Sequence, residues 1–436
     1  MSNLQLNEYL TQGAMLESQE KYEEALEYYN KALEIDKMSH DAYISKGVVL
    51  ANLERVDDAK EQFENALKVN RTSGLAYFHL GNVALLNLDM ALGFENYNKA
   101  ISNGFDDAQI YYNIALMHEE NGEMDLALRN YTKAISKNAI RPEFRLRKAQ
   151  LLMHLGNYPE ALETLDELIL TNPDVFEGYH VKFTALMHLR QYDKADEVIS
   201  KAIELFPDDV DFMLDKCALL TAQSKHDKAF QLLKEIEAKA GGNAIVLSKL
   251  YMERAQIHAT KQEADGAIAE LEKAKAIAIE HNAYNYEAQF LLINCFAVKK
   301  DFEKTLEYSR ELIERTDGED YFTSTAKYYI PYSLKNLGKM DEAKPLYIEA
   351  IDDLRAAGLQ SPGNLETYLL RAMCHYDLDE FDKALDLVDY VVKIKPDLPE
   401  PRLQKIAVLE AMGKKKEADE EKKAVNAMLP PDARIK

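Results

Sequence analysis

A small residue recurs every 34 positions through the first half of the chain, and this spacing constrains the fold more than any other feature. The series continues to the C-terminus in steps of 38, 38, 38, 41 and 34 residues, and ten of its twelve members are alanine. Self-similarity at a fixed period of this length is typical of a repeat architecture in which each unit contacts its neighbours. The members are Ala25, Ala59, Gly93, Ala127, Ala161, Ala195, Ala229, Ala267, Thr305, Ala343, Ala384 and Ala418.

Two further patterns share this period and indicate two helices per unit. In the first, an aromatic residue precedes a small residue by four positions, as Tyr111 precedes Ala115. In the second, alanine, a bulky residue and alanine follow at steps of four and three, as in Ala127, Tyr131 and Ala134. Both spacings place their members on one face of a helix, where small residues allow two helices to approach closely. The sequence therefore predicts an all-α fold of about twelve helical hairpins.

This order of small, aromatic, alanine, aromatic and alanine positions closely resembles the tetratricopeptide repeat, over residues ~6–432. The resemblance implies a right-handed superhelical α-solenoid of helix-turn-helix repeats. It also implies that the first helices line a concave groove that accepts extended peptides or helices. The same fold serves many purposes, so the resemblance leaves the partner open.

The repeats divide into two sub-arrays. Residues 6–239 hold repeats one to seven with the strict 34-residue period, and residues 248–432 hold repeats eight to twelve, which are longer and end in a polar cap. Between them, residues 240–247 contain the only Gly-Gly of the chain, which indicates a linker or soft boundary.

Three local features predict departures from the regular repeat. The four extra residues in each of repeats eight to ten amount to about one helical turn, so we expect longer second helices there. Gly358, Pro362 and Gly363 indicate a loop before repeat eleven. Pro331 falls inside a predicted first helix, which it should kink or break.

Charge and cysteine content restrict the partners and the compartment. The formal net charge is −22, which disfavours binding to nucleic-acid phosphates and to anionic membranes. The sequence has no apolar run long enough to span a membrane and no signal peptide at Met1. Its three cysteines suit a reducing compartment. We therefore expect a cytoplasmic protein without nucleic-acid or membrane partners.

Motifs of enzymes and metal sites are absent from the sequence. It has no glycine-rich phosphate loop, no Gly-x-Ser-x-Gly, no Cys-x-x-Cys and no His-Glu-x-x-His. Cys217, Cys295 and Cys374 fall at or beside small-residue positions, where a small buried hydrophobe explains them, with a redox sensor as the alternative. We expect no catalytic activity, no cofactor and no metal.

The candidate binding residues follow from repeat geometry, which places the groove at the second, fifth, sixth and ninth positions of each unit. Asn82, Asn113 and Arg147 fit three places of the carboxylate clamp of chaperone-binding members of the family, but Phe78 and Glu143 replace its two lysines. Repeat ten adds exposed aromatic candidates. The candidate groove residues are Phe78, His79, Asn82, Tyr112, Asn113, Leu116, Arg147, Gln150, His180, Tyr328 and Tyr332.

Helical phase sharpens this expectation in repeat four. Tyr111 and Ala115 should be buried between helices, whereas Tyr112 and Asn113 should be exposed on the concave side. The leading hypothesis is a protein–protein interaction scaffold or adaptor that binds polypeptide segments in the groove. The alternative is a peptide-sensing regulatory protein that acts on a separate output partner. The sequence does not identify the partner.

Overall fold

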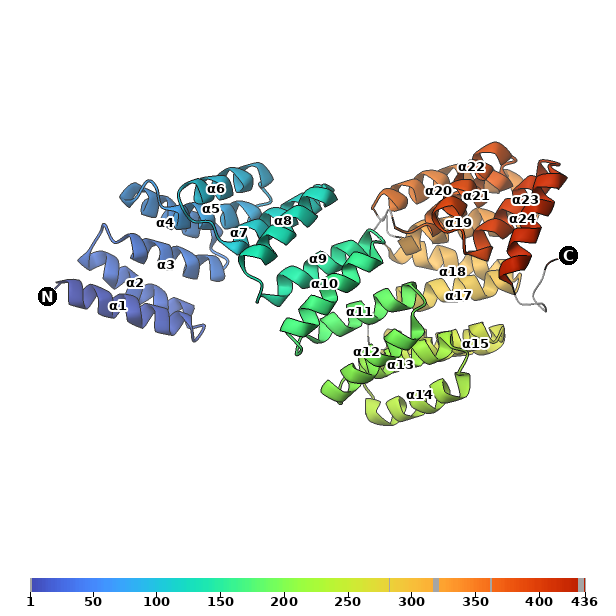
Figure 1. Cartoon of the computed structure of the whole chain (residues 1–436), viewed down its shortest axis with the longest axis horizontal. Helices are drawn as coiled ribbons and strands as arrows, with labels where there is room; N and C mark the ends of the chain where they lie inside the picture. The colour runs from blue at the N-terminus through green and yellow to red at the C-terminus, as the bar shows by residue number, and fades with distance from the viewer. Residues whose placement is uncertain (1, 282, 317–320, 361–362, 430–434, 436) are drawn as a thin grey trace. The chain divides into compact units, whose positions relative to one another are not determined.

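The computed structural model describes residues 2–281, 283–316, 321–360, 363–429 and 435. Over these residues the chain forms 24 α-helices joined by short connections, and they contain no strand (Figure 1). The helices of repeats one to six are α1 (Ser2–Glu17), α2 (Tyr22–Ile35), α3 (His40–Asn52), α4 (Val56–Val69), α5 (Gly74–Leu86), α6 (Met90–Ser102), α7 (Ala108–Glu120), α8 (Met124–Lys137), α9 (Pro142–His154), α10 (Tyr158–Thr171), α11 (Phe176–His188) and α12 (Tyr192–Leu205).

The second half of the chain continues in the same manner. Its helices are α13 (Val210–Ala222), α14 (His226–Ala240), α15 (Ala244–Thr260), α16 (Ala264–Glu280), α17 (Tyr286–Val298), α18 (Phe302–Arg315), α19 (Tyr321–Asn336), α20 (Met340–Gln360), α21 (Glu366–Asp377), α22 (Phe381–Ile394), α23 (Pro399–Ala411) and α24 (Lys415–Met428). Twelve helix pairs result, which confirms the predicted all-α repeat solenoid. None of the described helices is both long and apolar enough to cross a lipid bilayer.

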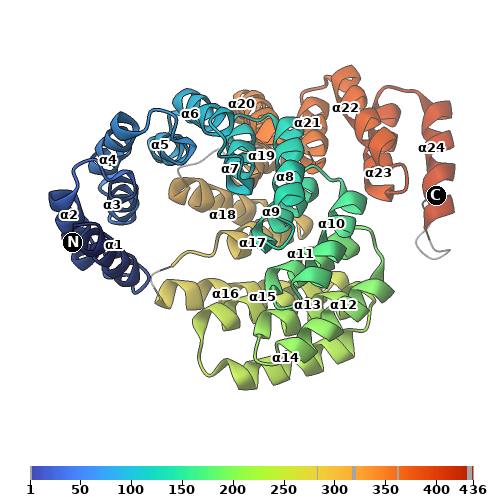
Figure 2. The same cartoon turned by 60° about the vertical axis from the view of Figure 1, so that its left-hand side comes forward.

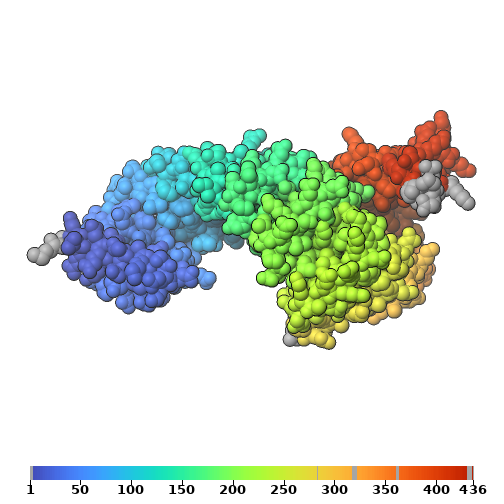
Figure 3. Space-filling view, turned by 60° about the horizontal axis from the view of Figure 1, so that its bottom comes forward, coloured from blue at the N-terminus to red at the C-terminus, as the bar shows by residue number. Residues whose placement is uncertain are grey.

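Helices pack mainly against their neighbours along the chain. The extensive helix contacts in the described part join helices that are adjacent or next but one in sequence, as α1, α2 and α3 are (Figures 1 and 2). In the space-filling view the colour passes gradually from blue to cyan across the N-terminal repeats for the same reason (Figure 3). The hairpin of α3 and α4, for example, contacts helices of the hairpins before and after it.

Polar caps and a left-handed residue define the ends of the helices. The side chains of Ser39, Ser73 and Asp209 accept hydrogen bonds from backbone N–H groups in the first turns of α3, α5 and α13. The turn between the two helices of each repeat contains one residue with positive φ, which is glycine in four repeats and another residue in eight. The eight are Glu20, Glu54, Leu88, Arg190, Ser224, Gln262, Lys300 and Asp379, and the four are Gly122, Gly156, Gly338 and Gly413.

Close approach of the two helices explains the small residue in the first helix. A Cβ added to Gly81 of α5 would lie 2.5 Å from Cε1 of Tyr97 in α6, and Gly47 has the same relationship to Phe63. Both aromatic rings are buried. A larger side chain at Gly81 or Gly47 would displace the aromatic ring that packs against that glycine.

The chain forms two compact units. One comprises residues 1–151 and 164–175, and the other comprises residues 152–163 and 176–436. The division passes through the hairpin of α9 and α10. The predicted boundary at 240–247 is a short turn within the second unit, where Gly241 is the left-handed C-cap of α14. Buried residues on both sides of this turn, including Leu233 and Leu250, belong to one cluster.

The predicted helix irregularities were right in part. The second helices of repeats eight and ten are long, with 17 residues in α16 and 21 in α20, but α18 of repeat nine has only 14. Helix α19 is not broken at Pro331, since it runs through to Asn336. Gly358 belongs to the elongated α20 and not to a loop, and Pro362 lies outside the described residues.

Candidate peptide-binding groove

The two asparagines proposed for the groove of the first unit bind each other. Nδ2 of Asn113 donates hydrogen bonds of 2.9 Å to Oδ1 of Asn82 and to the hydroxyl oxygen of Tyr97. The Tyr97 hydroxyl donates to the same oxygen of Asn82, and Gln109 donates to Asn113. Asn113 is only 8% exposed, so the expectation that it is exposed is wrong. The amide of Asn113 donates a hydrogen bond to the hydroxyl of Tyr97, a buried residue of the preceding hairpin. Helical phase alone does not predict this hydrogen bond.

The aromatic candidates of the same unit pack on neighbouring rings. His79 stacks on Phe63 with ring centroids 4.9 Å apart, and burial lowers its pKa to about 4. Phe78 contacts Tyr97 and Phe105, while Tyr112 contacts Tyr131 and Phe144. All three candidates are half-buried, including Tyr112, which was expected to be exposed. Tyr111 and Ala115 are buried, as predicted.

Arg147 is held by a carboxylate of the repeat before it. Its Nη2 atom lies 2.9 Å from Oε1 of Glu119, and the other oxygen of Glu119 accepts a hydrogen bond from the Tyr131 hydroxyl. Leu116 and Gln150 are half-buried on α7 and α9. Oδ1 of Asn82, Nδ2 of Asn113 and Nη2 of Arg147 are thus engaged within the protein, whereas Nε of Arg147 has no hydrogen-bond partner among the described residues.

The aromatic candidates of repeat ten lie mostly in the core. Tyr328 is 1% exposed and packs with Tyr347 and Cys374, so its expected place on a binding surface is wrong. Tyr332 is half-buried and stacks on Tyr328 with centroids 5.7 Å apart. Tyr328 is buried because residues of both α20 and α21 pack against the face of α19 that carries it.

His180, one of the predicted groove residues, lines a substantial cavity. The cavity has a volume of about 440 Å³ and lies along the first helices of repeats six to nine, α11, α13, α15 and α17. Apolar side chains form part of its wall, and charged side chains form the rest. The lining residues are Phe176, His180, Asp211, Leu214, Asp215, Lys249, Met252, Glu253 and Glu287.

Ion pairs inside this cavity occupy both of its basic groups. Nδ1 of His180 lies 2.6 Å from Oδ2 of Asp215, and Nζ of Lys249 lies 2.7 Å from Oδ1 of Asp211. Burial raises the pKa of Asp215, against the opposing effect of the hydrogen bond from His180. For His180, burial lowers the pKa, whereas the hydrogen bond and the charge of Asp215 raise it. The net effect is a raised pKa of His180, which favours the charged imidazolium.

Glu253 is the exceptional carboxyl group of the cavity. Its Oε2 atom is shielded from solvent and has no hydrogen-bond partner among the described residues. Burial raises the pKa of Glu253 to about 7, and the neighbouring charges of Asp215 and Glu287 add to the increase. A carboxylate without a cation or donor nearby is costly to bury, so this group is poorly stabilised by the protein itself.

A second cavity adjoins the first at the N-terminal ends of α15 and α17. It has a similar volume of about 440 Å³ and shares Lys249, Met252 and Glu287 with the first cavity. Its further lining is largely apolar and aromatic, with Ile245 exposed to 70% and Tyr286 to 40%. The two cavities adjoin at these shared residues, and we call them together the repeat 6–9 groove.

The position rule drawn from the sequence would have found this groove if it had been applied beyond repeat five. Asp211, Leu214 and Asp215 occupy the second, fifth and sixth positions of repeat seven, and Lys249, Met252 and Glu253 occupy the same positions of repeat eight. The residues predicted from the sequence lie in repeats three to five, except for His180 in repeat six and Tyr328 and Tyr332 in repeat ten. Of the residues that line the first cavity, only His180 is therefore among those predicted.

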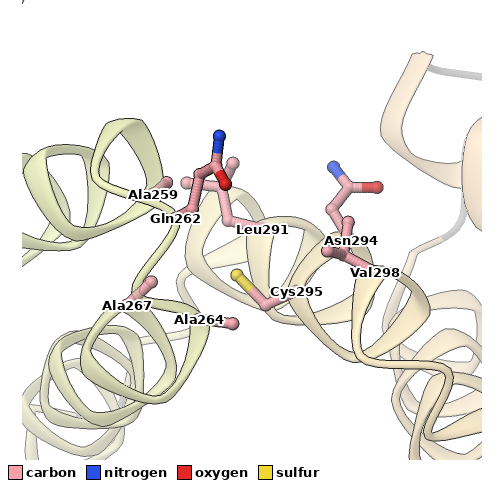
Figure 4. Close-up of a pocket in the computed structure, with 8 residues that line it drawn as sticks. All are labelled: Ala259, Gln262, Ala264, Ala267, Leu291, Asn294, Cys295 and Val298. Atoms are coloured by element: carbon pink, nitrogen blue, oxygen red, sulfur yellow. The ribbon is translucent and has the colours of Figure 1, made fainter. Parts of the chain in front are cut away.

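None of the three cysteines is among the lining residues of the repeat 6–9 groove. Cys217 and Cys374 are buried and Cys295 is half-buried, and burial raises the pKa of all three thiols. Cys295 extends from α17 toward the turn between α15 and α16, where mostly small and apolar side chains, together with Gln262 and Asn294, line a cavity of about 480 Å³ (Figure 4). A raised pKa leaves little reactive thiolate, which disfavours the redox-sensor alternative. The described residues include no group of three or more His, Cys, Asp or Glu side chains placed to hold a metal.

Comparison with known protein families and structures gives a consistent picture. Models of the tetratricopeptide repeat match residues 7–38, 44–108, 119–180 and 181–244. No match was found among curated protein sequences.

Solved structures with a similar fold include the Cut9–Hcn1 hetero-tetramer of APC/C, with 12% identity over 97% of this chain and 93% of the other, and a TM-score of 0.45. Yeast Tom70 shows 16% identity over 97% of each chain, with a TM-score of 0.44. YrrB, described as a TPR protein with an unusual peptide-binding site, shows 22% identity over 43% of this chain and 97% of its own, with a TM-score of 0.36.

The family models and the twelve helix pairs agree on the same repeat. The matched segments lie in the first seven repeats, and the helical hairpins continue to α24, with alanine of the same series at Ala267, Ala343, Ala384 and Ala418. The chain is a member of the tetratricopeptide repeat family, a family of protein-interaction scaffolds.

Proposed function

We propose that this protein is a non-catalytic scaffold or adaptor that binds polypeptide segments in the repeat 6–9 groove. The observation that carries the proposal is the position of the lining residues. Side chains at equivalent positions of successive first helices meet in two adjoining cavities, and the larger part of their lining belongs to these helices.

The composition of the groove suits a polypeptide better than a small polar metabolite. Apolar and aromatic residues such as Met252 and Tyr286 alternate with carboxylates along the groove, and the cavities are open to the surface through exposed residues such as Ile245 and Glu287. Exposed aromatic and apolar side chains beside polar groups are typical of binding surfaces for other proteins. The reducing cytoplasmic compartment suggested by the three cysteines stays part of the proposal.

The test is selection of binding peptides on the full chain, followed by a variant that fills the groove. Short random peptides would be displayed and selected, and the affinities of the selected peptides would be measured by isothermal titration calorimetry. Met252→Trp places a bulky ring where the two cavities meet. We expect it to weaken peptide binding about tenfold or more, which is typical of an altered hot spot.

A matched variant controls for the added tryptophan. Ile348 is 59% exposed on the second helix α20, so Ile348→Trp adds the same side chain away from the groove. Peptides that bind both variants equally well would contradict the groove assignment. Failure to select any binding peptide would contradict the proposal as a whole. Circular dichroism would show that both variants keep their helical structure.

A further inference from the structure

The charged groups of the repeat 6–9 groove are unbalanced, and this imbalance indicates the kind of ligand that the groove binds. Four carboxyl groups line its first cavity, at Asp211, Asp215, Glu253 and Glu287, against one lysine and one histidine. We infer that this cavity takes the cationic side chain of a bound polypeptide, lysine or arginine, while an apolar side chain of the same segment occupies the adjoining cavity. This inference rests on the proposed function and names the kind of segment that the groove recognises.

The cations of the protein itself are already committed. Lys249 pairs with Asp211 and His180 pairs with Asp215, at 2.7 and 2.6 Å. Neither basic group therefore neutralises Glu253 or Glu287. Glu287 stands at the exposed rim of the cavity, while Glu253 lies deeper on α15. Carboxyl groups that neither of these cations pairs with thus lie both at the rim and in the interior of the cavity.

The Oε2 atom of Glu253 is an independent sign of a missing partner. It is shielded from solvent, and the described residues supply it with no hydrogen-bond donor. Buried polar atoms in folded proteins nearly always have a partner, and an exception calls for a ligand or another explanation. An ammonium or guanidinium group provides N–H donors and the positive charge that this carboxylate lacks.

The rest of the wall suits the aliphatic part of a long basic side chain. Phe176, Leu214 and Met252 are apolar and line the same cavity as the carboxyl groups. Lysine and arginine commonly lay their methylene groups along apolar surface while the charged end reaches a polar site. A compact cation would leave this apolar lining unused, so the shape of the wall favours a long basic side chain.

The adjoining cavity explains why the ligand should be a polypeptide segment. Lys249, Met252 and Glu287 belong to both cavities, so a ligand in one is next to the other. Tyr284, Tyr286 and Phe322 supply aromatic surface in the second cavity. An extended segment advances about 3.3–3.6 Å per residue, so side chains a few positions apart can enter adjoining cavities of this size.

The experiment uses pools of blocked peptides, acetylated at the N-terminus and amidated at the C-terminus so that terminal charges play no part. One fixed position holds arginine, lysine, citrulline, leucine or glutamate, and the flanking positions are random uncharged residues. Citrulline keeps the shape of arginine without its charge. Binding of each pool to the full chain would be measured by fluorescence polarisation. We expect the arginine and lysine pools to bind about tenfold or more tightly than the other three, as for a close charge pair.

Variants then locate the binding to the carboxyl groups. Glu253→Gln and Glu287→Gln should each weaken binding of the arginine pool severalfold and leave the leucine pool unchanged. Glu349→Gln is the matched control, because Glu349 is exposed on the second helix α20 and its replacement changes the net charge by the same amount. Equal effects of the three variants would mean that the attraction comes from the overall charge of −22 and not from the cavity.

The outcomes separate this inference from the function on which it rests. If the leucine or citrulline pool binds as tightly as the arginine pool, the inference is overturned while peptide binding stands. The same holds if Glu253→Gln behaves like Glu349→Gln. If none of the pools binds, both the inference and the proposed groove function are overturned.

Discussion

Asn113 donates a hydrogen bond of 2.9 Å to Asn82, which lies in the first helix of the preceding repeat, 31 residues earlier in the chain. The same amide group donates to the hydroxyl of Tyr97, a fully buried residue of the helix between them. These bonds join three successive helices, α5, α6 and α7, through polar side chains. An asparagine at a groove position therefore stabilises the stack of repeats.

We predict that Asn113→Ala destabilises the protein. The substitution removes a donor to both Asn82 and Tyr97 and leaves buried polar atoms with fewer partners, which typically costs about 1–3 kcal/mol. Thermal unfolding followed by circular dichroism would measure the change. Asn98→Ala is the control, since Asn98 is exposed on α6. Equal melting temperatures for the two variants would show that the network contributes nothing.

Ala115 tests how closely α7 and α8 pack. Its side chain is fully buried, so Ala115→Leu must place three extra carbon atoms in a filled space. We expect a loss of about 1–3 kcal/mol in the free energy of unfolding, measured by chemical denaturation. Arg129→Leu adds leucine at an exposed position of α8 and should change stability little. A stable Ala115→Leu variant would argue against the close approach of the two helices.

Leu88 holds a strained backbone conformation that glycine would relieve. Its φ is 58°, in the left-handed region, and its side chain is 78% exposed, so little packing is lost on its removal. We predict that Leu88→Gly raises the free energy of unfolding by up to about 1 kcal/mol, because glycine adopts this conformation without the steric cost of a side chain. Gly122→Leu, at the equivalent position of the next repeat, should lower it. Changes of the opposite sign would show that the turn carries no strain.

Glu253→Gln should stabilise the protein above pH 7 although it weakens binding of basic peptides. The pKa of Glu253 is raised from 4.5 to about 7 in the folded state, mainly by burial and then by Asp215 and Glu287. The folded state therefore holds this proton more tightly than the unfolded state does. The cost of ionising Glu253 is absent below pH 4.5, grows between pH 4.5 and 7, and is complete above pH 7.

A shift of this size corresponds to at most about 3 kcal/mol, which glutamine avoids because it does not titrate. The other ionisable groups of the same cavity remain in both proteins, and they are Asp211, Asp215, Glu287, His180 and Lys249. Denaturation of the variant and the unaltered protein at pH 4.5 and pH 8 gives the comparison. A stability difference that does not grow with pH would contradict the assigned titration.

The proposed boundary at 240–247 can be tested with two fragments. Both should fold, because each hairpin packs mainly on its neighbours. The fragment of residues 1–260 should melt at a higher temperature than the fragment of residues 1–240, since Leu250 and Ile257 of α15 cover the cluster that includes Leu233. Equal melting temperatures would support an independent boundary after residue 239, and loss of helical structure in both fragments would show that the C-terminal repeats are needed for folding.

The sequence alone determined the repeat, the helix pairs and the buried small and aromatic residues. Ala115, Tyr111 and Ala127 are buried as predicted, because their positions reflect packing within one hairpin or between adjacent hairpins. Such contacts join residues close in sequence, so a regular period records them directly. The exceptions, such as the unbroken α19 at Pro331, are places where tertiary packing outweighs a local preference.

Only the tertiary structure decided what the polar residues do. Asn113 was assigned to a peptide because its position allows this, but burial beside Tyr97 commits its amide to the protein. The acidic cavity needs the first helices of four successive repeats side by side, and the pKa of Glu253 depends on charges from α13 and α17. Burial and electrostatic interaction depend on distances in space between residues that are far apart in the sequence, and no single repeat contains them.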